Sequence, residues 1–264
     1  MKWMRFAHAG REGFGLLEGD QIVVHRGDMF ASPQPTGERL AASDIEWLTP
    51  CQPTKMLALW NNFRAAAEKN GWAQPAEPLY FVKTPNSHAA HGAPIPVPAG
   101  DVGRVAYEGE LAIVIGRRAK AVSVADAPAF IFGYTCANDV TAIELLFRDP
   151  SFPQWTRAKG FDGFGVFGPV IETAFDVSTA SVRTTVAGRE RQNYALADMF
   201  FSPTELVSRL SHDMTLEVGD VILCGTSLGV VPMKPGSTVE IEIDGIGRLV
   251  NIYGPPQDQG SSLR

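Results

Sequence analysis

The stretch AYEGELAIVIG, residues 106–116, decides the fold class of this chain. Its apolar half is rich in the β-branched and aliphatic residues that favour a buried strand. Successive side chains of a strand point to opposite faces, so Glu108 and Glu110 share one face, and Leu111 and Ile113 lie on the other. Two carboxylates on one face repel each other unless they reach solvent or hold a cation between them. The pattern leaves both possibilities open, and Mg²⁺ or Mn²⁺ is the cation that suits all-oxygen ligands.

Further runs with strand character recur toward the C-terminus, separated by turn formers among the 26 glycines and 19 prolines. They are LYFVK (79–83), IFGYTCAND (131–139), GVFGPVI (165–171), VRTTVAG (182–188), DVILCGT (220–226) and STVEIEIDGIGRLVNI (237–252). Two helices are also marked. One lies within NNFRAAAEKNG (61–71) and stops at its glycine, and the other begins after Ser202 with a capping box to Glu205. The sequence therefore predicts an α+β fold that is mainly β.

The distribution of these runs predicts three parts. Residues 1–54 contain the candidate strands Met4–Ala7 and Gln21–Val24 and form a small N-terminal β-rich domain. Residues 55–253 hold most of the hydrophobic mass and form the larger domain, in which residues 61–78 make a short segment with few large apolar anchors. Residues 254–264 (GPPQDQGSSLR) are turn formers and polar residues, typical of a peripheral tail.

Composition excludes several classes of function. The formal net charge is −6 with no basic cluster, which argues against a nucleic-acid partner, and no apolar run reaches the roughly 20 residues of a membrane helix. The absence of a secretory pattern and of CxxC spacing among the three cysteines favours a cytoplasmic protein. Walker, GxSxG and GxGxxG motifs are missing, and the five histidines are not spaced as zinc ligands.

Three further features could contribute chemistry. Asp139 ends the run IFGYTCAND, where it is either a turn or capping residue or a third acid beside the first two. Lys159 in WTRAKGFDGFG is either a surface lysine or the cation that pairs with a substrate carboxylate or enolate. The turn CGTSLGV offers the backbone N–H of Gly225 and the hydroxyl of Thr226 at a strand end, where they can bind a carboxylate.

Four ordered motifs carry a family resemblance. AYEGELAIVIG, GYTCANDVT, RAKGFDGFGVFGPVI, and CGTSLGV followed by MKPGSTVEIEIDGIGRLVN together resemble the serial motifs of the fumarylacetoacetate hydrolase family over about residues 55 to 253. The resemblance implies a mixed β-roll and a Mg²⁺ or Mn²⁺ held by Glu108, Glu110 and Asp139. It also implies Lys159 as an active-site residue with Glu108, substrate contacts from Thr226 and Gly225, and a homodimer associating through the core domain.

One segment departs from the family pattern. Family hydrolases commonly carry a lid resembling NYRDHAAE, whose histidine and following glutamate activate water; here the lid, residues 61–78, has Ala66 and Lys69 at those positions, with Glu68 one residue away. Ile143 and Glu144 also stand where the family often has Arg and Asp. Arg64 of the lid is either an exposed helix arginine or a bidentate clamp for the distal carboxylate of a dicarboxylic substrate.

The missing lid histidine bears on the reaction, because only hydrolysis needs a base positioned for water. We therefore favour a divalent-metal-dependent enzyme that isomerises (tautomerises) or decarboxylates an unsaturated 2-oxo or 2-hydroxy dicarboxylic acid from aromatic ring cleavage. This is the isomerase/decarboxylase branch of the family. The alternatives are a C–C hydrolase of an acylpyruvate such as fumarylpyruvate, and a non-catalytic family member with a binding role.

Overall fold

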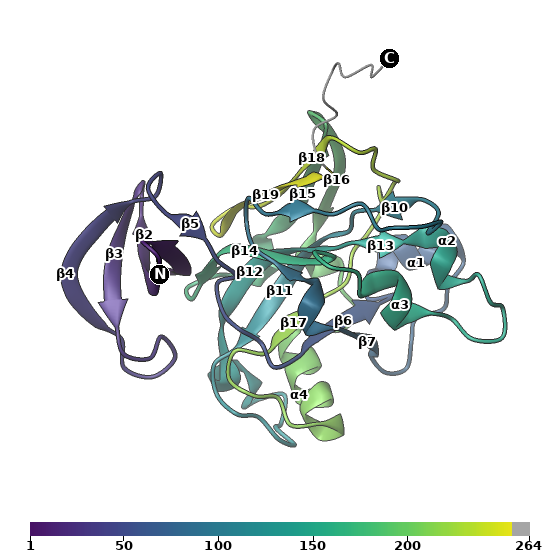
Figure 1. The fold of residues 1–264 in the computed structure, drawn as a ribbon. Helices are drawn as coiled ribbons and strands as arrows, with labels where there is room; N and C mark the ends of the chain where they lie inside the picture. The colour runs from purple at the N-terminus through teal and green to yellow at the C-terminus, as the bar shows by residue number, and fades with distance from the viewer. Residues whose placement is uncertain (255–264) are drawn as a thin grey trace, which may run out of the picture.

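The computed structural model describes residues 1–254, so the tail predicted for residues 254–264 lies outside the described residues except for Gly254. Strands dominate, and the chain forms a large mixed sheet, a second smaller sheet and a short two-stranded sheet, with helices at the periphery (Figure 1). The predicted mainly-β α+β class is confirmed. Within the described residues, no helix is both long and apolar enough to cross a membrane.

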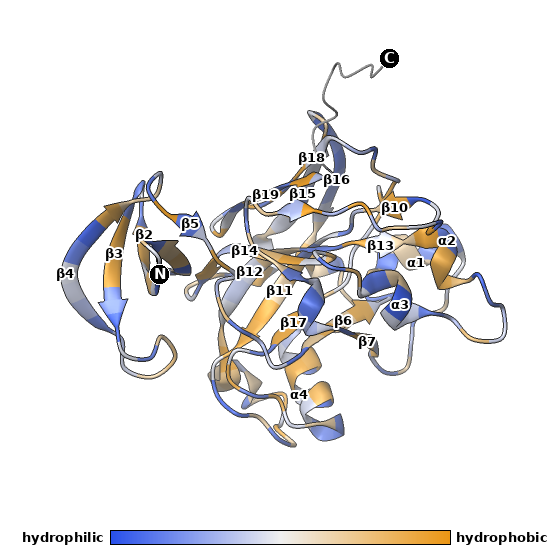
Figure 2. Cartoon of the chain, viewed as in Figure 1, coloured by the Kyte–Doolittle hydropathy of each residue, from blue (hydrophilic) through white to orange (hydrophobic). Residues whose placement is uncertain are grey.

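The N-terminal strands extend the large sheet. They are β1 (Lys2–His8), β2 (Arg11–Glu18), β3 (Gln21–Arg26), β4 (Gln34–Ala41) and β5 (Glu46–Trp47). β1 pairs antiparallel with β14 (Gly165–Glu172), which joins this part to the rest of the sheet. β1 and β3 contain the two predicted strands, whereas β4 was not expected, because its residues are largely polar and exposed (Figure 2).

The rest of the large sheet positions the candidate site. Its order is β4-β3-β2-β1-β14-β12-β11-β17-β6-β7, with β5 paired to β1 and β8 paired to β14. The additional strands are β6 (Met56–Trp60), β7 (Leu79–Lys83), β8 (His88–Ala89), β11 (Gly109–Ile115), β12 (Ile131–Asp139) and β17 (Val221–Leu223). β11 lies between β12 and β17 and is buried along its whole length, as its apolar sequence predicts.

Two smaller sheets complete the strand structure. The five-stranded sheet has the order β16-β15-β18-β19-β9. Its strands are β9 (Pro94–Ile95), β15 (Ser181–Val186), β16 (Arg189–Ala195), β18 (Ser237–Ile243) and β19 (Gly247–Tyr253), and β10 (Val105–Ala106) pairs with β13 (Thr141–Ala142). Side chains from both larger sheets meet in one core, which includes Leu111 of β11 and Ile241 of β18. This core covers one face of β11, and a second apolar cluster that includes Ala112 and Val114 covers the other face.

Four α-helices and four 3₁₀ turns lie within the described residues. The α-helices are α1 (Arg64–Asn70), α2 (Ile143–Leu146), α3 (Trp155–Lys159) and α4 (Pro203–Asp213), and the 3₁₀ turns are η1 (Pro85–Ser87), η2 (Ala127–Phe130), η3 (Val177–Thr179) and η4 (Leu196–Asp198). The predicted capping box of α4 is confirmed, since Ser202 and Glu205 bond each other's backbone N–H. α1 ends at Gly71 in a left-handed conformation, also as predicted.

Candidate active site

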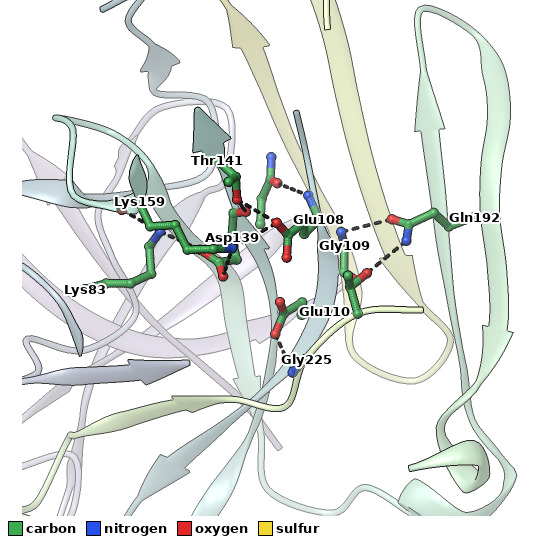
Figure 3. Close-up of polar contacts among 11 residues, drawn as sticks. Lys83, Glu108, Gly109, Glu110, Asp139, Thr141, Lys159, Gln192 and Gly225 are labelled. Atoms are coloured by element: carbon green, nitrogen blue, oxygen red, sulfur yellow. Dashed lines mark hydrogen bonds and ion pairs between the residues drawn. The ribbon is translucent and has the colours of Figure 1, made fainter. Parts of the chain in front are cut away.

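The two glutamates of the EGE motif stand at the start of β11 (Figure 3). The glycine between them is required by packing, because a Cβ on Gly109 would lie 2.0 Å from Thr184 Oγ1. Gly109 N–H also donates to Gln192 Oε1 at 3.0 Å, which ties this strand end to the smaller sheet. The motif thus keeps Glu108 and Glu110 on one face of the strand, and the glycine lets Thr184 approach closely on the other face.

Cross-strand register supplies the third acid. Gly109 pairs with Asn138 of β12, so the next residue of β12, Asp139, lies beside Glu108. Asp139 N–H donates to the Glu108 carbonyl at 3.0 Å, and Glu108 N–H donates to Asn138 Oδ1 at 3.0 Å. One oxygen each of Glu108, Glu110 and Asp139 lies within 4.8 Å of the others. The structure therefore brings the three predicted acids together.

The acid cluster is buried rather than solvated. Glu110 and Asp139 are fully buried, and the side chain of Glu108 is 18% exposed. The interpretation of a solvated strand end is therefore wrong for Glu110, and the interpretation of a turn or capping residue is wrong for Asp139. Glu110 Oε2 accepts from Gly225 N–H at 2.6 Å, but Glu110 Oε1 is buried and has no hydrogen-bond partner among the described residues.

That unpartnered oxygen is the test of whether a cation fits. A buried carboxylate oxygen without a donor is unfavourable, and a hard divalent cation is the ligand that three clustered carboxylates suit. Burial, followed by the nearby charges of Asp139 and Glu108, raises the pKa of Glu110 well above its ordinary value. Three observations thus fit an Mg²⁺ or Mn²⁺ ion at Glu108, Glu110 and Asp139. All three offer carboxylate oxygens, these oxygens lie close together, and one buried oxygen has no hydrogen-bond partner among the described residues.

Lys159 at the end of α3 is not a surface lysine. Its side chain is 3% exposed, and Nζ donates to Glu108 Oε1 at 2.8 Å and to Asp139 Oδ2 at 2.6 Å. Burial alone would lower its pKa, but the carboxylates of Asp139 and Glu108 outweigh burial and raise it. Lys159 therefore stays protonated and directs its charge into the acid cluster.

Lys83 is a second buried lysine that the sequence analysis did not single out. Its Nζ donates to Asp139 Oδ1 at 2.5 Å and to the Lys159 carbonyl at 2.7 Å, and its side chain is fully buried. Burial would raise the pKa of Asp139, yet the two ammonium groups outweigh it and hold that pKa below its ordinary value. The signal was present in LYFVK, because Phe81 and Lys83 share the buried face of β7.

The glycine-rich turn after β17 supports the acids directly. Gly225 has a φ of 90°, a left-handed conformation that suits glycine, and its N–H is engaged by Glu110. Thr226 Oγ1 donates to the Gly109 carbonyl at 2.9 Å and accepts from Gln192 Nε2 at 2.8 Å. Both residues are therefore placed at the site. In this structure the Gly225 N–H and the Thr226 hydroxyl donate to protein groups, and contacts from these two residues to a substrate stay a prediction.

A cavity of about 490 Å³ opens beside the cluster. Glu108, Lys159, Thr141 and Thr226 line its polar end, and Glu110 and Asp139 lie behind them. Thr141 Oγ1 donates to Glu108 Oε1 at 2.6 Å, which fixes the carboxylate nearest the cavity. Most of the remaining lining is aromatic or aliphatic, the composition typical of a small-molecule site.

The lid helix α1 forms part of the cavity wall through Ala66, Lys69 and Asn70. Arg64 is not among the lining residues; its guanidinium donates to the Met199 carbonyl and lies over the Phe200 ring, 5.1 Å from the centroid. The structure thus does not bring Arg64 to the other predicted site residues. Its position matches the alternative of an exposed helix arginine.

Ile143 and Glu144, the other departure from the family pattern, have different surroundings. Ile143 lines the cavity and presents an apolar side chain to it. Glu144 accepts from the backbone and side chain of Arg104 instead, and it does not line the cavity. Neither residue contributes a charge to the cavity wall.

Comparison with known proteins assigns the family. A model described as "Fumarylacetoacetate (FAA) hydrolase C-terminal" matches residues 55–252, and one described as "Rv2993c-like, N-terminal" matches residues 1–50. The first match covers most of the chain and contains all three clustered acids and both buried lysines. The chain belongs to the fumarylacetoacetate hydrolase family, and the resemblance stated from the motifs is confirmed.

Several individual proteins are similar over most of the chain. The crystal structure of 5-carboxymethyl-2-hydroxymuconate delta-isomerase from Mycobacterium smegmatis is 38% identical with a TM-score of 0.89, covering 96% of this chain and 99% of that one. The 4-hydroxyphenylacetate degradation bifunctional isomerase/decarboxylase of Salmonella dublin is 38% identical over 89% of this chain and 56% of the relative. Oxaloacetate tautomerase YisK of Bacillus subtilis is 33% identical over 90% of this chain and 85% of the relative.

Proposed function

We propose that this chain is a divalent-metal-dependent enzyme that tautomerises or decarboxylates an unsaturated 2-oxo or 2-hydroxy dicarboxylic acid of the kind released by aromatic ring cleavage. The observation that carries the proposal is the buried cluster of Glu108, Glu110 and Asp139 beside Lys159 at the polar end of a cavity. The names of the isomerase, decarboxylase and tautomerase relatives support it.

Glu108, Glu110 and Asp139 would hold the cation. When bound, a Mg²⁺ or Mn²⁺ ion would supply Lewis-acid stabilisation of the negative charge that develops on a 2-oxo acid as it enolises. The three acids are held in place by contacts that do not depend on a ligand: Thr141 bonds Glu108, Gly225 bonds Glu110, and Lys83 bonds Asp139. A preorganised ligand set of this kind needs little rearrangement to bind.

Lys159 is the residue that we assign to the substrate. An ammonium group has three N–H donors, and two of them are used by Glu108 and Asp139. The third is left for a ligand oxygen in the cavity that Lys159 lines. In that role Lys159 would stabilise the negative charge on the enolate oxygen and hold that oxygen in place. The apolar walls of the cavity would restrict the access of water.

Tautomerisation passes through the enolate, and loss of CO₂ from a β-keto acid forms the enolate, which is then protonated; neither reaction needs an activated water. At the two lid positions where family hydrolases carry histidine and glutamate, this cavity has Ala66 and Lys69. The side chains on that wall therefore offer no carboxylate or imidazole base at those positions. This favours tautomerisation or decarboxylation over the second candidate, C–C hydrolysis of an acylpyruvate.

A panel assay tests the proposal. Unsaturated 2-oxo diacids, oxaloacetate and acylpyruvates are incubated with Mg²⁺ or Mn²⁺ or with chelator, and the ultraviolet absorbance of the enol and the release of CO₂ are followed. We expect metal-dependent conversion of diacids and slow cleavage of acylpyruvates. Faster acylpyruvate cleavage would establish the hydrolase instead. Stabilisation by metal without any conversion would support the non-catalytic binding role.

A further inference from the structure

Lys69 on the lid helix gives the cavity a second lining cation in addition to Lys159. We propose that Lys69 is a specificity-determining residue that binds the distal carboxylate of a dicarboxylic substrate. The inference rests on the proposed function for the placement of the 2-oxo acid end. It assigns to Lys69 the role that the sequence had suggested for Arg64.

Helix geometry explains why Lys69 and not Arg64 faces the cavity. Residues three and four apart share one face of a helix, and Ala66, Lys69 and Asn70 of α1 all line the cavity. Arg64 and Glu68 are absent from that lining. α1 is also held in this orientation, because the Ala65 N–H donates to Asp198 Oδ2 at 2.9 Å and Phe63 is fully buried.

Few charged side chains line the cavity, and not all of them form an ion pair. Three lining residues carry charge: Glu108, Lys159 and Lys69. The first two pair with each other at 2.8 Å. Within residues 1–254, no carboxylate lies within the 4.0 Å ion-pair distance of Lys69. Lys69 is therefore the cation on this wall that is free to bind an anion from solution.

The side chain at position 66 adds to the argument. Ala66 leaves room on the cavity face, one helical turn from Lys69, so that the long lysine side chain meets no bulky neighbour there. Asn70, on the same face, donates to the Ala66 carbonyl at 2.7 Å. The face of α1 that lines the cavity therefore carries neutral side chains except for the ammonium group of Lys69.

Flat aromatic side chains form much of the cavity wall. Trp60, Trp72, Phe81, Phe147 and Trp155 all line the cavity. Their rings contact one another, with Trp60 and Trp72 centroids 4.9 Å apart and Phe81 stacked on Trp155 at 5.1 Å. Aromatic faces pack well against planar groups. A conjugated chain that carries two anionic groups suits a cavity lined by these rings and by two lysines.

Matched ligands and matched variants test the proposal by calorimetry at saturating Mg²⁺. The ligands are 2-oxopentanedioate and 2-oxopentanoate, which have the same chain length and differ in the terminal carboxylate. The variants are Lys69→Met, Lys69→Glu and, as a control with the same charge change on the same helix, Arg64→Glu. Thermal unfolding of each variant and its Mg²⁺ affinity are measured alongside.

We expect the parent to prefer the diacid, and Lys69→Met to weaken diacid binding about fivefold while monoacid binding changes less than about twofold, as for a partly exposed ion pair. Lys69→Glu should weaken diacid binding further, and Arg64→Glu should leave the preference in place. Equal losses for both ligands, or a preference that survives in Lys69→Met, would overturn the assignment. Binding of both ligands that is independent of metal would instead contradict the proposed function.

Discussion

Two parts of the site hold their charges in different ways: the three clustered acids with Lys83 and Lys159, called the acid end, and the face of α1 that lines the cavity, called the lid end. At the acid end, Glu110, Asp139, Lys83 and Lys159 are buried, and every carboxylate is fixed by at least one hydrogen bond from the protein. At the lid end, Lys69 is exposed and has no such partner among the described residues. The first arrangement is suited to binding a cation in one geometry, and the second to accepting different anions. We infer that the acid end sets the chemistry and the lid end sets the choice of substrate.

The largest effect is expected at the acid end from Glu110→Gln. The substitution keeps the shape but removes a charge from the ligand set, so metal binding should fall by at least about a hundredfold and metal-dependent activity should be lost. Calorimetric titration with Mn²⁺ measures the first, and the enol absorbance assay measures the second. Glu68→Gln on the exposed side of the lid is the matched control. Parent-like Mn²⁺ affinity in Glu110→Gln would remove Glu110 from the ligand set.

Lys159→Met separates chemistry from metal binding. Loss of a preorganised charge should lower kcat by about 10²- to 10³-fold, whereas the three carboxylates remain and Mn²⁺ affinity should change far less than in Glu110→Gln. Steady-state kinetics at saturating Mn²⁺ and a Mn²⁺ titration of the same preparation provide both values. An unchanged kcat would show that Lys159 serves only to neutralise the acids.

A stability measurement sharpens the contrast between the two lysine environments. Lys83→Met removes one partner of a buried ion pair and should lower the free energy of unfolding by about 3 kcal/mol. Lys69→Met removes an exposed charge and should change the free energy of unfolding by less than about 0.5 kcal/mol. Urea unfolding of the two variants without added metal tests this difference. Similar losses of unfolding free energy in the two variants would contradict the distinction between the buried acid end and the exposed lid end.

The smallest effect is expected from rebuilding the lid dyad. Ala66→His with Lys69→Glu places an imidazole and a carboxylate on the helix face that lines the cavity, so slow acylpyruvate cleavage should rise by a modest factor, about tenfold. Release of pyruvate from an acylpyruvate is the readout, with Arg64→His plus Glu68→Gln as a control on the same helix. No increase would mean that the lid residues alone do not limit hydrolysis.

Part of the acid end was predictable from local pattern because strand alternation is a short-range rule, whereas the grouping of all three acids into one metal site came from the family resemblance. Alternation puts Glu108 and Glu110 on one face, and the end of an apolar run marks where Asp139 emerges. The partner of Glu110 at Gly225 depends on a contact between residues 115 positions apart, which no local pattern encodes. Lys83 was missed because lysine is rarely fully buried, although alternation places it on the same face as the buried Phe81.

The lid and the N-terminal strands show where local rules fail. The helical segment and its end at Gly71 followed from composition, but which residues of α1 face the cavity depends on tertiary contacts such as Asp198 to Ala65. β4 is a strand despite its polar sequence, because β3 provides backbone partners along its length. Pairing with a neighbouring strand overrides residue preference at such an edge.

Whether Glu108, Glu110 and Asp139 hold one divalent cation can be tested by anomalous scattering from crystals grown with saturating Mn²⁺. We expect one strong anomalous peak per chain within about 2.0–2.4 Å of an oxygen from each of the three carboxylates. The peak should be absent from crystals of Glu110→Gln grown in the same way. A parent crystal with no peak among these three side chains, or with Mn²⁺ bound only elsewhere, would show that the three acids do not form a cation site.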